Sequence, residues 1–61
     1  MKRREFVREL TSRGCYLKRH GANDDIYYNP QNGRVAPVPR HAEVRESLAR
    51  AIRKQLGVSD K

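Results

Sequence analysis

The spacing of the apolar residues changes twice along this 61-residue chain, and that order constrains its fold. Residues 2–13 and 43–56 carry apolar side chains three and four positions apart, which predicts an amphipathic helix at each end. Between them apolar and polar residues alternate, which predicts half-buried strands. These strands are expected at residues 15–20, 25–28 and 34–38. The pattern therefore predicts an α+β fold of order α-β-β-β-α, with a three-stranded antiparallel sheet and two helices on one face.

The alternation also predicts which side chains share a face of the sheet. The first strand is expected to place Cys15 and Leu17 on one face. Its other face then carries Tyr16, Lys18 and His20. In the second strand, Ile26 and Tyr28 are expected to share a face, with Tyr27 on the opposite one.

Turn and helix-end signals set the boundaries between these elements. Residues 29–33 combine a proline with an Asn-Gly pair, which is typical of a tight turn. Pro37 has no backbone N–H, so the third strand is expected to lie at an edge of the sheet or to end there. Gly57 is the expected end of the last helix. The apolar stripe of that helix is predicted to consist of Val44, Leu48, Ala51, Ile52 and Leu56.

The length allows one small domain, which we place at residues 1–58, followed by a short C-terminal tail at 59–61. Cys15 is the single cysteine, so the domain has no internal disulfide, and we expect a buried apolar residue in a cytoplasmic protein. One cysteine and two separated histidines give no metal-ligand spacing. We expect no metal, no cofactor and no membrane segment.

The charge of the chain points to a polyanionic partner. Fourteen Lys and Arg residues against seven Asp and Glu residues give a net charge of +7, which attracts phosphate groups. Arg4 and Arg8 are expected on the polar face of the first helix. That face and the loops between strands are suited to contact the phosphates and 2′-hydroxyls of RNA.

Several short motifs, taken together, resemble the HicA-type toxins. They are Met1–Phe6, Gly14-Cys15, Arg19–Tyr27, Asn29–Gly33, Pro39-Arg40-His41 and the closing helix Glu43–Leu56. The resemblance runs in order through nearly the whole chain. It implies a small ribonuclease with a double-stranded-RNA-binding-like fold, which cleaves messenger RNA without a metal. It also implies a protein partner, a HicB-like antitoxin that silences the toxin.

The resemblance further implies a catalytic histidine at the start of the second strand, after a glycine-rich turn. Residues 21–23 correspond to that turn, and position 24 holds Asp24 in place of the histidine. RNA cleavage needs a general base and a general acid, and an imidazole that titrates near neutrality can serve as either. A carboxylate with an ordinary pKa of about 4 is ionised at pH 7 and does not readily donate a proton. We therefore expect an inactive or weakened ribonuclease.

Three explanations of Asp24 stay open. The histidine was replaced, by design or by a natural single-base change, so that the toxin lost its activity. Alternatively, the chain is a degenerate paralogue that binds RNA or antitoxin without cutting. In the third explanation, His20 or His41 has taken over the proton transfer.

Other side chains are candidates for the RNA site. His41 belongs to the Pro-Arg-His motif and ranks above His20, with capping of the last helix as its alternative role. Arg40 is suited to grip a phosphate through two parallel hydrogen bonds. Tyr27 is a candidate for stacking on a base, with cross-strand packing as the alternative. The full set of predicted RNA-binding residues is Arg4, Arg8, Lys18, Arg19, His20, Gly21, Tyr27 and Arg40.

Two rival functions need no catalysis. A non-catalytic RNA-binding module, or a decoy that binds the antitoxin, needs only the basic surface. A protein-interaction domain would use its charge to find an acidic partner. A magnesium nuclease is disfavoured, because Asp24 and Asp25 are adjacent in a strand and point to opposite faces.

Overall fold

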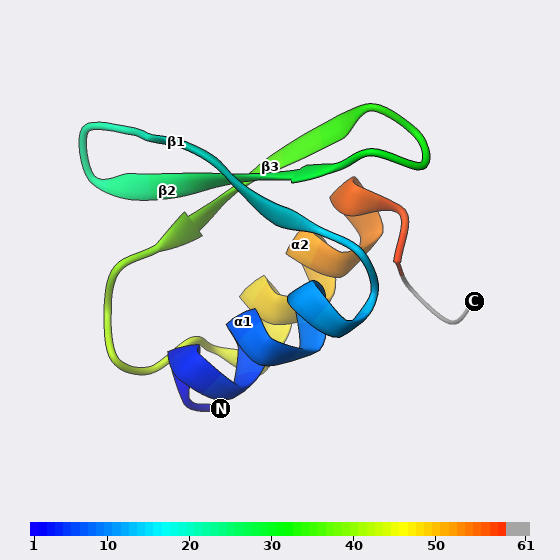
Figure 1. Cartoon of the computed structure of the whole chain (residues 1–61). Coiled ribbons are helices and arrows are strands. Elements are labelled where there is room, and N and C mark those ends of the chain that lie inside the picture. Colours follow the sequence, from blue (N-terminus) through cyan, green and yellow to red (C-terminus); the bar gives the residue numbers. More distant parts are fainter. Residues whose placement is uncertain (59–61) are drawn as a thin grey trace.

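The computed structural model describes residues 1–58, which form five elements in the predicted order (Figure 1). The elements are α1 (Arg3–Ser12), β1 (Tyr16–His20), β2 (Asp24–Asn29), β3 (Arg34–Pro39) and α2 (Glu46–Leu56). The sheet is one layer, and both helices lie on the same side of it (Figure 1). The predicted α-β-β-β-α fold is confirmed. The predicted tail at 59–61 lies outside the described residues.

The three strands form an antiparallel sheet of order β1-β2-β3, with β2 in the centre. β2 and β3 pair without interruption, from Asp24 opposite Pro39 to Asn29 opposite Arg34. Within residues 1–58, β3 has β2 as its one sheet neighbour. Pro37 therefore stands on an edge strand, as its missing N–H predicts.

β1 contains a β-bulge at Lys18. The pairs on either side of it are Leu17–Tyr27, Arg19–Ile26 and His20–Asp25, so Lys18 is the extra residue. An extra residue shifts the alternation of the following side chains by one position. The prediction that His20 shares a face with Lys18 is therefore wrong. His20 instead shares the face of Asp25, its partner in β2.

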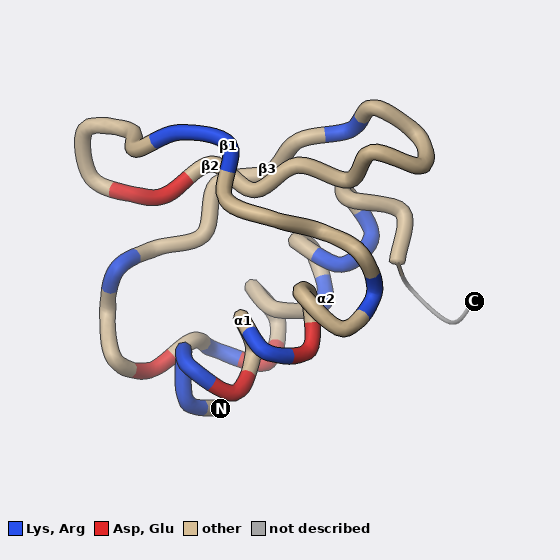
Figure 2. The backbone as a smooth tube through the Cα atoms, in the orientation of Figure 1, with Lys and Arg blue, Asp and Glu red and all other residues tan. Residues whose placement is uncertain are grey.

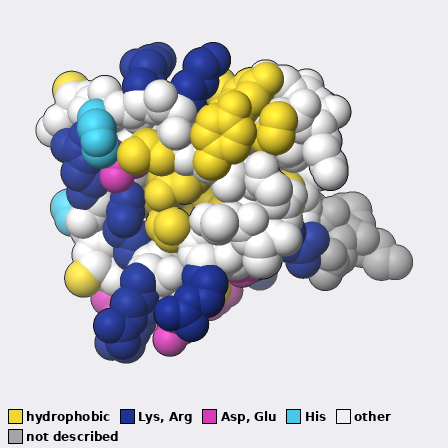
Figure 3. Space-filling view, viewed as in Figure 1, with side chains coloured by type: hydrophobic (Ala, Val, Ile, Leu, Met, Phe, Trp, Pro, Cys, Tyr) yellow, Lys and Arg dark blue, Asp and Glu magenta, His cyan; other side chains and the backbone are white. Residues whose placement is uncertain are grey.

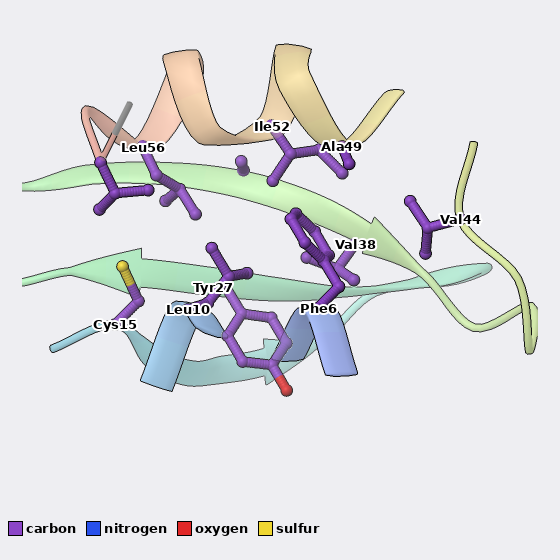
Figure 4. Close-up of a cluster of buried hydrophobic side chains, with 11 residues drawn as sticks. Phe6, Leu10, Cys15, Tyr27, Val38, Val44, Ala49, Ile52 and Leu56 are labelled. Carbon is purple, nitrogen blue, oxygen red and sulfur yellow. The ribbon is translucent and has the colours of Figure 1, made fainter. Parts of the chain in front are cut away.

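The helices cover the face of the sheet that carries Asp25, Tyr27 and Asn29. The core between sheet and helices is formed by Phe6, Leu10, Cys15, Tyr27, Ala36, Val38, Val44, Ala49, Ile52, Leu56 and Val58 (Figure 4). Cys15 is buried, as predicted, and burial raises the pKa of its thiol. Ile26 and Tyr28 share a face, as predicted, and that face carries no helix.

The last helix begins at Glu46, three residues later than predicted. The preceding segment pairs with the N-terminus instead: the Arg3 N–H donates to the Ala42 carbonyl (2.8 Å) and the Val44 N–H to the Met1 carbonyl (2.8 Å). Val44 therefore enters the core from an extended segment. The buried stripe of α2 is Ala49, Ile52 and Leu56, whereas Leu48 and Ala51 are exposed, contrary to prediction.

The turn between β2 and β3 holds the C-terminus of α2. Asn29 is 2% exposed, and its Nδ2 donates to the Leu56 carbonyl at 2.8 Å. Asn32 Nδ2 donates to the same carbonyl at 2.9 Å. Gly57 ends α2 with a left-handed φ of 74°, which confirms the predicted stop. Neither helix in residues 1–58 is long and apolar enough to cross a membrane.

Candidate functional site

Three side chains from three parts of the fold meet around the carboxylate of Asp25. This residue lies at the start of β2, faces the helices and is 8% exposed. Its partners are Arg3 Nη2 (2.6 Å to Oδ2), His20 Nδ1 (2.8 Å to Oδ1) and Arg40 Nε (2.9 Å to Oδ1). Arg3 comes from the first turn of α1, His20 from the end of β1, and Arg40 from the loop after β3. We call Arg3, His20, Asp25 and Arg40 the Asp25 cluster.

The cluster keeps Asp25 ionised. The hydrogen bond with His20 lowers the pKa of Asp25 below its ordinary value, the hydrogen bond and charge of Arg40 lower it further, and the opposing effect of burial is smaller. One carboxylate therefore faces two guanidinium groups and one imidazole. This leaves an excess of positive charge, which favours a bound anion.

His20 is held by one ring nitrogen and exposed at the rest of its ring. An ionised carboxylate only accepts hydrogen bonds, so Nδ1 carries the proton that is shared with Asp25. The neutral ring then has an unprotonated Nε2, which is the form that serves as a general base. The His20 side chain is 70% exposed, so a substrate can reach it from solvent.

Arg40 ties the cluster to the β1–β2 hairpin. Its Nη2 donates to the carbonyls of Gly21 (2.8 Å) and Asp24 (3.1 Å). Its Nη1 makes no hydrogen bond to any residue that the structure describes, so its two N–H groups can donate to an anion. Arg3 is fixed more fully, because its Nε also donates to the Pro39 carbonyl at 2.7 Å.

Asp24 lies on the other face of the sheet from Asp25, as expected for adjacent residues in a strand. Its carboxylate lies over Gly21, where a Cβ would stand 2.5 Å from Asp24 Oδ1 and 3.0 Å from the Asp24 carbonyl oxygen. A larger residue at position 21 would therefore require the Asp24 side chain to move and the turn to shift slightly. Among residues 1–58, the Asp24 carboxylate has no ion-pair partner.

One protein family, described as the HicA toxin of bacterial toxin–antitoxin systems, matches this chain over residues 3–58. The chain belongs to the HicA toxin family. The match spans all five elements and includes every residue of the Asp25 cluster. The match confirms, at the level of the family, that the short motifs are those of a HicA-type toxin. No curated protein and no solved structure matches the chain.

The other predicted site residues of this HicA chain are distributed over several surfaces. His41 is exposed in the loop before α2, and its side chain makes no hydrogen bond to a described residue. It caps no helix, because α2 begins at Glu46 with Arg45 as its N-cap. Tyr27 is buried in the core, so the structure gives it the packing role and leaves its ring no free face for a base.

The predicted basic contacts lie on two sides of the molecule. Lys18 and Arg19 are exposed on β1, and Arg4 and Arg8 are exposed on α1. The acidic residues of the sheet are confined to the start of β2, while Lys and Arg occur on β1, after β3 and on both helices (Figure 2). Near α1, a surface hollow of about 370 Å³ is lined by Lys2, Arg3, Arg4, Ala42 and Glu43.

Sequence reasoning missed the roles of Asp25 and Arg3. One signal for Asp25 was present: a two-residue turn at residues 22–23 sets Gly21 against Asp24 and so places His20 directly opposite Asp25 in the antiparallel hairpin. No local signal identifies Arg3, which reaches the cluster from a separate element. In the part of the chain that the structure describes, no three His, Cys, Asp or Glu side chains are grouped as metal ligands.

Proposed function

We propose that this HicA chain is the toxin of a toxin–antitoxin pair and acts as an RNA endonuclease that blocks translation, in a form weakened by Asp24. The family match and the net charge of +7 support the proposal. The Asp25 cluster carries it, because an exposed imidazole held by an ionised carboxylate stands beside two guanidinium groups. Such an arrangement joins an acid–base group to anion-binding groups, which cleavage of a phosphodiester requires.

Cleavage without a metal needs two proton transfers. A base takes the proton of the 2′-hydroxyl, whose oxygen attacks the phosphorus, and an acid protonates the departing 5′-oxygen. Asp24 stands where the family resemblance implies the catalytic histidine. An ionised carboxylate at that position is a weak base and a poor acid at pH 7, and its charge repels the phosphate. Asp24 therefore removes most of the activity.

His20 is the best-placed group for the activity that remains. Its Nδ1 is held by Asp25, so its orientation is fixed, whereas His41 has no such orienting carboxylate among the described residues. Arg40 can donate hydrogen bonds from Nη1 to a phosphate on the same side of the hairpin as His20. Lys18 and Arg19 supply further positive charge on β1.

The protein partner in this proposal is a HicB-like antitoxin. Such a partner would cover the hairpin end around Asp24 and the basic surface near it. Complementary acidic groups on the antitoxin would speed its association, and added salt would slow it.

Expression in bacterial cells that lack an antitoxin tests the proposed function. The Asp24→His variant is expected to arrest growth and deplete messenger RNA, and co-expression of a cognate HicB-like antitoxin is expected to restore growth. The unmodified chain, at equal protein level, is expected to slow growth much less. Asp24→Asn is the matched control, because it removes the charge without supplying an imidazole. Unchanged growth and mRNA with a folded, expressed Asp24→His variant would contradict the proposal.

Non-catalytic RNA binding is the second candidate function. Asp24 itself favours it, because the basic surface remains complete while the implied catalytic histidine is absent. This alternative predicts that RNA binds with an affinity that falls steeply with salt, and that Asp24→His gains no cleavage.

A further inference from the structure

The face of the sheet that carries no helix combines exposed aromatic and basic side chains. We call it the outer sheet face, formed by Tyr16, Lys18, Arg19, Ile26, Tyr28 and Val35. Tyr16 and Val35 are among the exposed large hydrophobic residues of the protein, and Tyr16 is 51% exposed. Figure 3 shows hydrophobic side chains gathered beside Lys and Arg side chains over the sheet.

The two tyrosines and Lys18 form one group on this face. The rings of Tyr16 and Tyr28 meet edge to face, with centroids 5.5 Å apart. The Lys18 ammonium lies over the Tyr28 ring, with Nζ 4.9 Å from the ring centroid. The contact with Tyr28 orients the Tyr16 ring, which is more exposed than a core or packing role requires.

The bulge in β1 gives this face its charge. In a regular strand, Lys18 and Arg19 would point to opposite faces. Because Lys18 is the extra residue, Arg19 instead pairs with Ile26 on the outer sheet face, where Lys18 contacts Tyr28. Two cations therefore stand beside two aromatic rings, and the acidic residue on the same side of β2, Asp24, lies at the other end of the strand from Tyr28.

We propose that the outer sheet face binds a single-stranded segment of RNA. A base stacks on Tyr16, and Lys18 and Arg19 contact the phosphates on either side of it. Aromatic rings interleaved with basic side chains are the usual means of holding unpaired bases. The charge complementarity favours RNA over an apolar protein surface, which would leave both cations without partners.

The position of this face also suits position 24, where the family resemblance implies the catalytic histidine. Asp24 lies on the same face of β2 as Ile26 and Tyr28. Tyr28 lies four positions after Asp24 along β2, a distance of about 13 Å. RNA held at the tyrosines thus extends along β2 to position 24. This inference rests on the proposed function, because it takes RNA as the ligand.

Fluorescence anisotropy with a labelled single-stranded RNA oligonucleotide of mixed sequence tests the inference. Tyr16→Leu keeps an apolar side chain but removes the ring, and it is expected to weaken binding about 5- to 100-fold, as loss of one stacked base does. Tyr16→Phe keeps the ring and is expected to bind within about 2-fold of the unmodified chain. Lys18→Gln is expected to weaken binding and to reduce the slope of log affinity against log salt by about one.

Two controls make the result specific. Leu48→Ala changes an exposed apolar residue of α2, away from the sheet, and should leave RNA affinity unchanged. A duplex RNA of the same sequence should not distinguish Tyr16→Leu from Tyr16→Phe, because its bases are already stacked. Thermal unfolding of each variant verifies that it is folded.

The outcomes separate this inference from the proposed function. If the unmodified chain binds RNA and Tyr16→Leu binds it equally well, the RNA function stands and the role of the outer sheet face is wrong. The role of the outer sheet face in RNA binding is also wrong if Tyr16→Leu keeps its affinity for RNA but no longer binds the antitoxin. The face then binds a protein partner. If the unmodified chain binds no RNA, both proposals fail.

Discussion

Asp24 and Asp25 are adjacent, yet the strand turns their carboxylates to opposite faces of the sheet. Asp25 is buried and receives hydrogen bonds from Arg3, His20 and Arg40. Asp24 lies over Gly21 on the outer side. The two residues carry the same charge but have different surroundings. Removing the charge of Asp25 is therefore expected to affect stability differently from removing that of Asp24.

Asp25→Asn is expected to lower the free energy of unfolding, and Asp24→Asn is expected to change it little. The amide at position 25 no longer neutralises the two guanidinium groups, which stay partly buried without a counter-charge. Urea unfolding at pH 7 measures both variants against the unmodified chain. Equal effects of the two substitutions would contradict the structural role of Asp25.

The difference in unfolding free energy between the unmodified chain and Asp25→Asn is expected to depend on pH. Because the pKa of Asp25 is lowered in the folded protein, the unfolded chain takes up this proton more readily than the folded one. The stabilisation by Asp25 is therefore complete above the unfolded pKa of about 4 and is lost as the pH falls through the lowered folded pKa. Urea midpoints from about pH 7 to pH 2 should show the unmodified chain and Asp25→Asn converging in acid. A difference that stays constant with pH would contradict this.

At the scale of the elements, local signals predicted the order of helices and strands but not every boundary. Pro37 on the edge strand and Gly57 at the end of α2 follow from backbone chemistry within a few residues. The bulge at Lys18 and the late start of α2 depend on pairing between separate segments. Alternation and helical spacing contain no information about such pairing, so these features were missed.

Asn29 links two elements, and its loss should destabilise the fold. Its Nδ2 is a buried donor to the Leu56 carbonyl at the end of α2. Asn29→Ala is expected to cost about 1–3 kcal/mol of unfolding free energy, as loss of a buried hydrogen-bond partner does. Asn32→Ala is the control and should cost less, because Asn32 bonds to the same carbonyl from an exposed position. Urea unfolding of both variants tests this order, and the reverse order would contradict it.

At the scale of the whole molecule, the candidate site depends on contacts between distant parts of the chain. The Asp25 cluster combines residues 3, 20, 25 and 40, and the backbone around residue 3 is held by Ala42. The motifs near Gly21 and Arg40 indicated the two loops that contribute to the candidate site. The arrangement of Asp25, His20 and Arg3 follows only when the helix, hairpin and final loop are packed together.

The rate of RNA cleavage by the purified chain and by its Asp24→His variant, at neutral pH in a metal chelator, tests the proposed ribonuclease most directly. Asp24→His is expected to cleave at least about 100-fold faster than the unmodified chain, as restoring a general acid–base group does. Any residual cleavage by the unmodified chain should fall with His20→Gln and persist with His41→Gln. Cleavage by neither protein, while both still bind RNA, would contradict the nuclease function and leave a non-catalytic RNA-binding domain.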